Sequence, residues 1–327
     1  MITSKNPLIS VLIPAYNSAK FIDRAIKSIL NQEYDNWEII IVDDGSTDST
    51  GLIVDGYTKS HDRITTIHQQ NRGYIYTNNF LATKATGEYV LFLDSDNWLE
   101  SNDVLSKAVE AIILYSVDVV CLPCSYIFEN KKQPHKVLPI LKEDCLCNDY
   151  HAVSEAIKSG TIFVHTHGGK IIKRTLLDGL QLSGCPTGAD SRFFSAILAR
   201  SNTVYCLSKP SMFVEVRPHS LSDVRYDSLF YLGWIKESEN DFWVYYEEKR
   251  KKQNIIFYQL SLLLKMYVDY IFSPDRTKDG LRYCSKLFWS NRPLFHAVYP
   301  NIKFWLLCRH YNLYRCFYKI INSNKES

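Results

Sequence analysis

Four short runs of apolar, largely β-branched residues in the first hundred positions predict β-strands, at residues 8–13, 37–42, 63–68 and 89–93. Between them, apolar residues recur at the spacing of an amphipathic helix, most clearly over residues 18–32 and again near 77–86. Strands that alternate with helices predict an α/β fold, with a mostly parallel sheet covered by helices on both faces.

Polar motifs follow three of these strands directly, at residues 14–17, 43–48 and 94–97. In open parallel sheets the carboxyl ends of the strands line one edge, and ligands bind beyond that edge. We therefore expect the three motifs to meet at one rim of the sheet.

The third motif, Asp94-Ser95-Asp96, places two carboxylates one residue apart at the end of an apolar run. Like charges so close repel each other, and a divalent cation between them relieves the repulsion. Asp and Ser are also common turn formers, so the motif by itself fits an ordinary turn equally well.

The rest of the chain has a weaker pattern. Short strands are predicted at 117–122, 204–207 and 212–216, with helices near 151–159 and 190–200. From about residue 230 the pattern is helical and rich in aromatics. An almost entirely apolar helix is predicted over 255–272, where Pro274 ends it.

Charge is distributed unevenly. The net charge is only +3, but residues 249–327 carry 15 Lys and Arg against 4 Asp and Glu, so this segment is +11 and the remainder −8. Basic residues interleaved with large aromatics suit the headgroup layer of an anionic membrane, so we expect peripheral membrane contact there. The alternative is a solvated basic face on helices that pack against the rest of the chain. Nucleic-acid binding is not expected, because no recognition module accompanies the charge.

The nine cysteines are scattered without the spacing of a disulfide scaffold or a zinc knuckle, which favours a reduced, cytoplasmic protein. The first residues lack a charged and then apolar leader, and no uninterrupted apolar stretch is long enough to span a bilayer. Two common nucleotide-binding loops are also excluded. No Gly-x-Gly-x-x-Gly follows the first strand, and Tyr57 stands where a P-loop spaced from Gly51 requires lysine.

Taken together, residues 10–17, 41–48 and 87–96 closely resemble family 2 glycosyltransferases of the GT-A fold. The resemblance implies a Rossmann-like, mostly parallel sheet flanked by helices. It also implies an inverting, metal-dependent transfer from a UDP-sugar donor to a glycan or lipid-linked acceptor, in bacterial surface polysaccharide synthesis. We expect a catalytic domain over 1–225, with a nucleotide-binding half (1–100) and an acceptor half (101–225), and a helical C-terminal region over 226–327.

The resemblance assigns the first motif to the nucleotide. Pro14, Ala15, Tyr16 and Asn17 would lie along the nucleobase, where an aromatic face and backbone groups suit a flat ring. Asp44 would read uracil, because a carboxylate accepts the N–H that this base presents.

The second group of implied ligands surrounds the diphosphate. Asp94 would bind the ribose or a metal-bound water, with Ser95 in the same turn, and Asp96 would ligate Mn²⁺ or Mg²⁺. Arg217 would pair with phosphate, and His219 would be a further metal ligand or phosphate donor.

Asp190, in the first turn of a predicted helix, matches the position that the family uses as general base. Three positions depart from the family pattern: Ala189 replaces the usual Glu, Asn78 replaces an Arg that holds the nucleotide, and His167 stands near a usual Trp. Arg72 is a candidate to compensate for Asn78. These departures leave a second hypothesis open, a catalytically silent sugar-nucleotide-binding subunit of a polysaccharide assembly complex.

Overall fold

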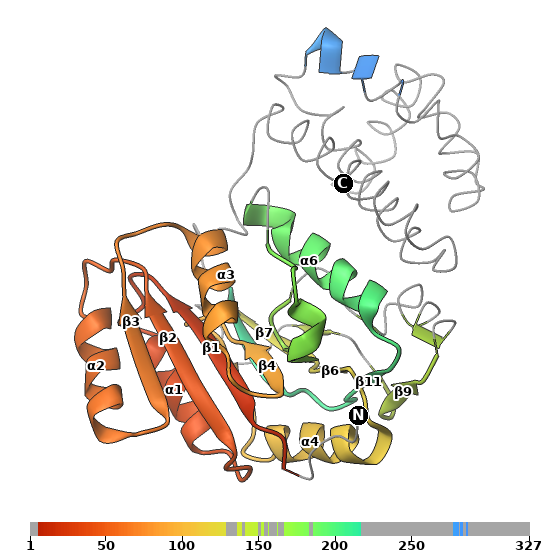
Figure 1. Cartoon of the computed structure of the whole chain (residues 1–327), viewed down its shortest axis with the longest axis horizontal. Helices are drawn as coiled ribbons and strands as arrows, with labels where there is room; N and C mark the ends of the chain where they lie inside the picture. The colour runs from red at the N-terminus through yellow and green to blue at the C-terminus, as the bar shows by residue number, and fades with distance from the viewer. Residues whose placement is uncertain are drawn as a thin grey trace, which may run out of the picture. The chain divides into compact units, whose positions relative to one another are not determined.

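The computed structural model describes residues 6–128, 136–138, 141–149, 152–153, 156, 162, 167–182, 186–216, 277–280, 282–283 and 286 (Figure 1). The chain divides into two compact units, Met1–Val224 and Arg225–Ser327. In the second unit the described residues from 278 onward are helical. The helix predicted over 255–272 lies outside the described residues. Within the described part of the chain, no helix is long and apolar enough to cross a membrane.

The main sheet has the strand order β3-β2-β1-β4-β10-β6-β11-β9 among the described residues. The strands are β1 (Ile9–Ala15), β2 (Trp37–Asp43), β3 (Ile64–His68), β4 (Tyr89–Phe92), β6 (Val119–Cys121), β9 (Cys145–Cys147), β10 (Lys170–Lys173) and β11 (Val204–Cys206). The first four are parallel to one another, as the sequence pattern predicts. Strand β10 runs antiparallel between β4 and β6, and β9 is antiparallel to β11.

A second, smaller sheet has the order β5-β12-β7-β8 and joins segments that are far apart in the chain. Its strands are β5 (Trp98–Leu99), β7 (Cys124–Phe128), β8 (Lys136–Leu138) and β12 (Met212–Val216). Because β5 begins just after residues 94–97, its pairing with β12 brings the chain around residue 215 next to that turn. The backbone N–H of Glu215 donates to Asn97 Oδ1 across 3.3 Å.

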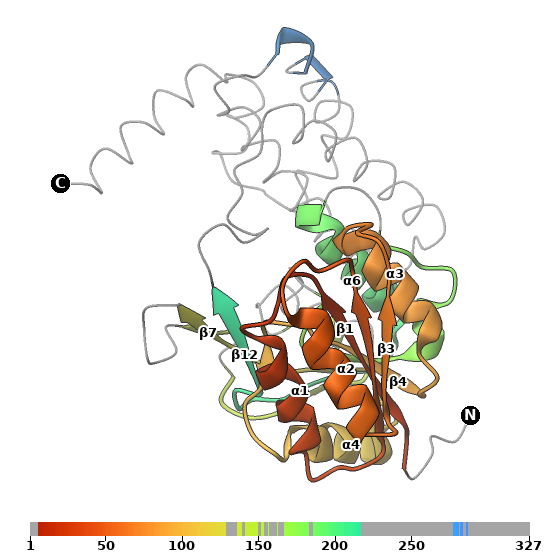
Figure 2. The same cartoon turned by 90° about the vertical axis from the view of Figure 1, so that its left-hand side faces the viewer.

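Helices cover both faces of the main sheet (Figures 1 and 2). Helices α1 (Ile22–Leu30), α2 (Thr50–Ser60) and α4 (Val104–Tyr115) contribute side chains to one buried cluster on one face. Helices α3 (Tyr74–Lys84) and α6 (Pro186–Arg200) lie on the other face, and the short 3-10 helix η1 (Arg174–Leu177) follows β10. The helices predicted over 18–32, 77–86 and 190–200 are therefore confirmed, with shifted ends.

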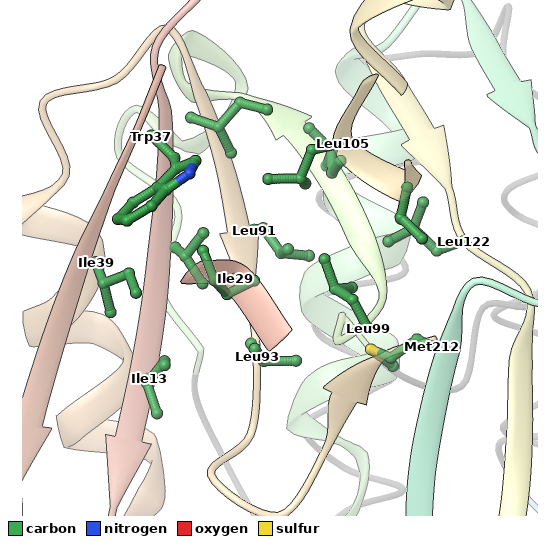
Figure 3. Packing of buried hydrophobic residues seen from close by; sticks show 14 of the residues in the cluster. Ile13, Ile29, Trp37, Ile39, Leu91, Leu93, Leu99, Leu105, Leu122 and Met212 are labelled. Carbon is green, nitrogen blue, oxygen red and sulfur yellow. The ribbon is translucent and has the colours of Figure 1, made fainter. Parts of the chain in front are cut away.

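The two faces are separated by the alternation of side chains along each strand. Ile13, Leu91 and Leu93 pack with Ile29 of α1 and Leu105 of α4 in one cluster (Figure 3). The intervening Phe92 points to the opposite face, where its ring centroid lies 6.0 Å from that of Phe193 in α6. Burying each such side chain contributes about 1.5–3 kcal/mol. Packing on both faces therefore holds the carboxyl ends of β1, β2 and β4 in fixed positions.

Candidate active site

The three polar motifs meet at one edge of the sheet, as the sequence predicts. Strands β2, β1 and β4 are neighbours and parallel, so the residues that follow them leave the sheet side by side. We refer to residues 14–18, 43–48 and 94–97 as the rim. The predicted site residues Pro14, Ala15, Tyr16 and Asn17, together with Asp44, Asp94, Ser95 and Asp96, all belong to it.

Asn17 joins the first motif of the rim to the second. Its backbone is in the left-handed region, with φ of 48°, which asparagine tolerates better than most residues. Its Oδ1 accepts a hydrogen bond from the Thr47 backbone N–H (2.8 Å), and its own N–H donates to Ser46 Oγ (3.0 Å). These reciprocal bonds hold the two loops at one separation.

Ser18 joins the first motif to the third. Its Oγ lies 2.7 Å from Ser95 Oγ, and both side chains are buried. Its backbone N–H donates to Thr50 Oγ1 at the start of α2 (2.7 Å). Ser95 therefore serves as a link within the rim, because its hydroxyl is engaged by Ser18.

Tyr16 is the exposed aromatic of the rim. Half of its surface is accessible, whereas the neighbouring Ala15 is buried. The carbonyl of Ala15 accepts a hydrogen bond from the backbone N–H of Asp44 (2.8 Å). This bond places Asp44 beside the backbone of the Ala15–Tyr16 segment. An exposed ring next to a buried carboxylate is suited to a flat heterocycle with one N–H.

The Asp44 carboxylate is held from one side by the segment that precedes α3. Oδ1 accepts from the Gln69 side-chain amide (2.7 Å) and the Arg72 backbone N–H (2.8 Å), and Oδ2 accepts from the Gly73 N–H (2.9 Å). A carboxylate has about four acceptor positions, so Oδ2 keeps one for a ligand. Three donors fix the direction in which that position points.

Gly45 makes this arrangement possible. Its φ of 74° is a conformation that L-amino acids rarely adopt, and a Cβ there would lie 2.7 Å from the Asn71 backbone nitrogen. The preceding Asp43 orders the same loop. Its Oδ1 accepts the Ser46 N–H (3.1 Å), and its Oδ2 lies 3.0 Å from His68 Nδ1.

Asp94 and Asp96 stand at the other end of the rim. Asp94 accepts from the Tyr74 hydroxyl (3.4 Å) and from Asn97 Nδ2 (3.2 Å). Burial and, next, the nearby carboxylate of Asp96 raise the pKa of Asp94 to about 7, while His167 opposes the rise. Negative charge is therefore costly here, which is the electrostatic condition that a bound cation relieves.

This pair of carboxylates fits a divalent cation of the Mg²⁺ or Mn²⁺ type. Such hard cations prefer oxygen ligands, and Mg²⁺ in particular is often held by one or two carboxylates together with substrate phosphates. Among the described residues, no group of three or more His, Cys, Asp or Glu side chains gathers into a metal site. Among the described residues, Asp94 and Asp96 are therefore the candidate protein ligands, and phosphate oxygens of the substrate would complete the coordination of the cation. Arg217 and His219 lie outside the described residues.

Arg24 supports the turn that carries Asp96, and the sequence analysis did not single it out. Its guanidinium donates to the Asp96 carbonyl (3.2 Å) and to Glu215 (2.8 Å). It also lies over the Trp98 ring, 3.3 Å from the centroid. Nothing in the pattern of α1 distinguishes this Arg from a solvated one, because its partners lie in the turn at Asp96, in β5 and in β12.

Asp190 lies in the first part of α6, next to a buried histidine. His167 Nδ1 is 3.1 Å from Asp190 Oδ1. The two atoms are not aligned as a hydrogen bond, and neither has another partner among the described residues. His167 is 1% exposed, so this contact is shielded from water.

Tyr74 and Lys170 complete what we call the Asp190 cluster, with His167 and Asp190. Burial raises the pKa of Tyr74 well above its usual range, and the charges of Asp190 and Asp94 act in the same direction. Burial lowers the pKa of Lys170, whose Nζ donates to the Gly168 carbonyl (3.0 Å). Tyr74 and Lys170 are not among the site residues predicted from the sequence. Tyr74 follows Gly73 directly, and Lys170 follows two glycines. These adjacent glycines are the only feature of the local sequence that could have marked the two residues as candidates.

The departures from the family pattern have definite environments. Asn78 is fully buried, and its Nδ2 donates to the Tyr74 carbonyl (3.0 Å), so it supports α3 internally. Arg72 is at the surface, with its guanidinium carbon 3.5 Å from the Tyr76 ring centroid. Its backbone N–H binds Asp44, as described above. Ala189 is buried and has no polar side-chain atom.

Known proteins resemble this chain in sequence. Glycosyltransferase GlyA of Streptococcus pneumoniae is 29% identical over 222 residues, which is 66% of this chain and 32% of GlyA. The putative teichuronic acid biosynthesis glycosyltransferase TuaG of Bacillus subtilis is 41% identical over 110 residues, 33% of this chain and 43% of TuaG. The match therefore spans about a third of the length of GlyA and less than half of TuaG.

The fold has solved counterparts. Residues 1–349 of Staphylococcus aureus TarS superpose with a TM-score of 0.66 at 20% identity, over 90% of this chain and 82% of that one. The same TarS segment in complex with UDP-GlcNAc gives a TM-score of 0.61 at 20% identity, over 89% and 81% of the two chains. At this identity the likeness concerns the fold, and the expected GT-A architecture is confirmed.

A family model described as glycosyl transferase family 2 matches residues 10–180, more than half of the chain. That range includes all three motifs of the rim, on which the sequence resemblance depended. The chain belongs to the family 2 glycosyltransferases.

Proposed function

We propose that this chain is an inverting, metal-dependent glycosyltransferase that moves a sugar from a UDP-sugar to a glycan or lipid-linked acceptor in bacterial surface polysaccharide synthesis. One observation carries the proposal. The rim carries an exposed aromatic ring, Tyr16, and an oriented carboxylate, Asp44, and it ends at a carboxylate pair, Asp94 and Asp96. The pKa of Asp94 is raised toward neutrality by burial and by its neighbour. Membership of the family and the TarS complex with UDP-GlcNAc support the choice of a nucleotide-sugar donor.

In this proposal each side chain has a chemical task. Tyr16 and Asp44 bind the uracil, Asp94 the ribose or a metal-bound water, and Asp96 the cation. Arg217 and His219 contribute to the diphosphate and the cation from beyond residue 216. When bound, a divalent cation offsets the negative charge that develops on the departing diphosphate.

Asp190 is the general base of the proposed reaction. It removes the proton from the acceptor hydroxyl while that oxygen forms a bond to C1 of the donor sugar. The bond between C1 and the diphosphate oxygen breaks on the opposite side, so the anomeric carbon is inverted and UDP leaves. A positioned base of this kind contributes roughly 10²–10⁴ in rate.

The test is a panel of UDP-sugars, each incubated with the protein and Mn²⁺ or Mg²⁺, with release of UDP as the readout. We expect metal-dependent release from at least one donor, abolished by EDTA. The competing hypothesis is a silent sugar-nucleotide-binding subunit, which the replacements at Ala189 and Asn78 leave open. Binding of UDP with Mn²⁺ but no release from any UDP-sugar would establish that alternative.

We also propose that the region over 226–327 contacts an anionic membrane surface, which suits an acceptor carried on a lipid. The support is the charge of +11 over residues 249–327, interleaved with aromatics. The full chain is expected to float with liposomes that contain an anionic lipid and not with neutral ones. Replacing Lys249, Arg250, Lys251 and Lys252 by glutamine should weaken flotation, and unchanged flotation would refute a role for that cluster.

A further inference from the structure

Two buried polar atoms of the Asp190 cluster face each other, and neither takes part in a hydrogen bond within the described part of the chain. His167 Nδ1 and Asp190 Oδ1 lie 3.1 Å apart, and neither has a hydrogen-bond partner among the described residues. Leaving a buried polar atom without a hydrogen bond destabilises the folded state. A site that tolerates two such atoms in contact calls for a functional explanation.

Aromatic rings fix the orientation of the His167 side chain. Its ring centroid lies 4.7 Å from that of Phe92 and 5.7 Å from that of Phe193, with interplanar angles of 80° and 83°. Tyr74 borders a third side, at 6.3 Å. With 1% of its surface exposed, the imidazole cannot swing toward solvent, so its separation from Asp190 is set by β4 and α6.

The contact also determines which ring nitrogen carries a proton. A carboxylate oxygen can only accept a hydrogen bond. If Nδ1 carried no proton, its lone pair would face a lone pair of Asp190 Oδ1 and the two atoms would repel each other. A protonated Nδ1 makes the contact attractive, and a rotation of the Asp190 side chain would be needed to align the hydrogen bond. The Asp190 side chain is 22% exposed although its Oδ1 is buried, so the accessible surface belongs to its other atoms.

We propose that His167 is a positioning residue for Asp190. Its Nδ1–H holds Oδ1, and this leaves Oδ2 free to receive the acceptor proton. The inference rests on the proposed function, in which Asp190 is the base. During transfer the acceptor proton passes to Oδ2 as the new bond to C1 forms and the bond to the diphosphate breaks, while His167 keeps its own proton.

Two departures from the family pattern meet at this point. Ala189, where a Glu is usual, is buried and brings no polar atom to Asp190. His167, near the position of a usual Trp, brings one to within 3.1 Å. The orienting group beside the carboxylate is therefore supplied from the segment before β10 and not from α6 itself.

The first test is independent of turnover. In wild-type protein the ¹⁵N chemical shifts of the His167 ring are expected to report a protonated Nδ1. In Asp190→Asn those shifts should change, because the carboxylate that the proton faces is gone. Ring signals that are identical in the two proteins overturn the inference, whether or not the protein releases UDP.

The second test is kinetic and uses metal-dependent UDP release from the UDP-sugar that the panel selects. His167→Phe is expected to lower kcat roughly tenfold to a hundredfold, as expected for a misplaced reacting group, with KM for the donor nearly unchanged. His167→Asn keeps a side-chain N–H and should recover part of the loss. In an Asp190→Asn background, His167→Phe should add nothing, because the two residues act as one unit.

A matched control separates this effect from a general loss of stability. Tyr89→Phe removes another buried polar atom, the hydroxyl that donates to the Val117 carbonyl (2.8 Å), away from the Asp190 cluster. It should lower thermal stability but not kcat. Full kcat in His167→Phe, or a loss that appears only in KM, overturns the inference. Absence of UDP release from the wild-type protein would instead refute the proposed function.

Discussion

The rim and the Asp190 cluster differ in how their polar side chains are satisfied. On the rim, Asn17 accepts a hydrogen bond from Thr47 and donates one to Ser46, and Asp44 accepts three from the segment before α3. In the Asp190 cluster, His167 and Asp190 keep buried atoms without hydrogen-bond partners among the described residues. Satisfied groups hold a fixed shape before a ligand arrives. In the Asp190 cluster the two atoms without partners face each other, and in our proposal this leaves Asp190 Oδ2 for the acceptor proton. The first arrangement suits binding and the second suits chemistry.

The largest expected effect separates the two regions. Asp190→Asn should leave UDP affinity in the presence of Mn²⁺ unchanged, because the rim is intact, and should reduce sugar transfer by roughly 10²–10⁴. Isothermal titration measures the first quantity and UDP release the second. Full transfer activity in this variant would show that Asp190 is not the base.

The second largest effect is expected on binding of UDP, which the first variant leaves unchanged. Asp96→Ala removes the proposed cation ligand from the rim and should weaken Mn²⁺-dependent UDP binding roughly tenfold to a hundredfold. Binding of UDP without metal should change little. Asp62→Ala, at an exposed position before β3, is the matched control and should bind as wild type does. Equal metal dependence in Asp96→Ala and wild type would contradict the assignment.

A stability effect tests how rigid the rim is. Gly45→Ala forces an L-residue into φ of 74° and places a methyl group 2.7 Å from the Asn71 nitrogen. The left-handed conformation alone costs about 1–2 kcal/mol, which lowers Tm by roughly 2–8 °C in a domain of this size.

Gly56 provides the control, because a Cβ there would meet nothing within 4 Å and its φ is ordinary. Gly56→Ala lies in α2 and should leave Tm unchanged or raise it slightly. Similar Tm values for the two variants, measured by scanning fluorimetry, would show that the loop around residue 45 can relax.

The smallest expected effect concerns pH. His68 lies between Asp55 (Nε2 to Oδ1, 2.9 Å) and Asp43 (Nδ1 to Oδ2, 3.0 Å), and these two carboxylates raise the pKa of His68. The folded state therefore binds this proton more tightly than the unfolded state does. The resulting stabilisation is complete below the unfolded pKa of about 6.5 and is lost as pH rises through the folded value.

His68→Gln tests this dependence. The difference in Tm between wild type and His68→Gln should shrink as pH is raised from 6 to 9. Because nearly half of the His68 side chain is exposed, we expect a shift of a few degrees at most. A difference that stays constant across this pH range would show that the charge on His68 does not support the Asp43 loop.

Much of the first half of the fold could be predicted from its pattern. Strands at 37–42 and 89–93 are buried on both faces and are apolar except for Glu38, and each is followed by a polar motif. Strands β7, β8 and β9 were not predicted. They are three to five residues long. Strands β7 and β9 pair with β12 and β11, which are distant in the chain, and β8 pairs with β7.

The site divides in the same way. The motifs of the rim could be recognised because each is a run of consecutive residues at the end of a strand. Arg24 could not, because its carboxylate partner, Glu215, lies 191 positions away and only the pairing of β5 with β12 brings them together. Tyr74 and Lys170 stand next to glycines in segments with no periodic signal.

The sequence by itself determined the α/β class, the family and the carboxylates of the rim, because periodicity and short motifs are local properties of a chain. The tertiary structure decided which side chains support those carboxylates and that His167 lies 3.1 Å from Asp190. That distance follows from the packing of α6 and the segment before β10 on one face of the sheet. No local pattern encodes such packing, since it depends on contacts between residues distant in the chain.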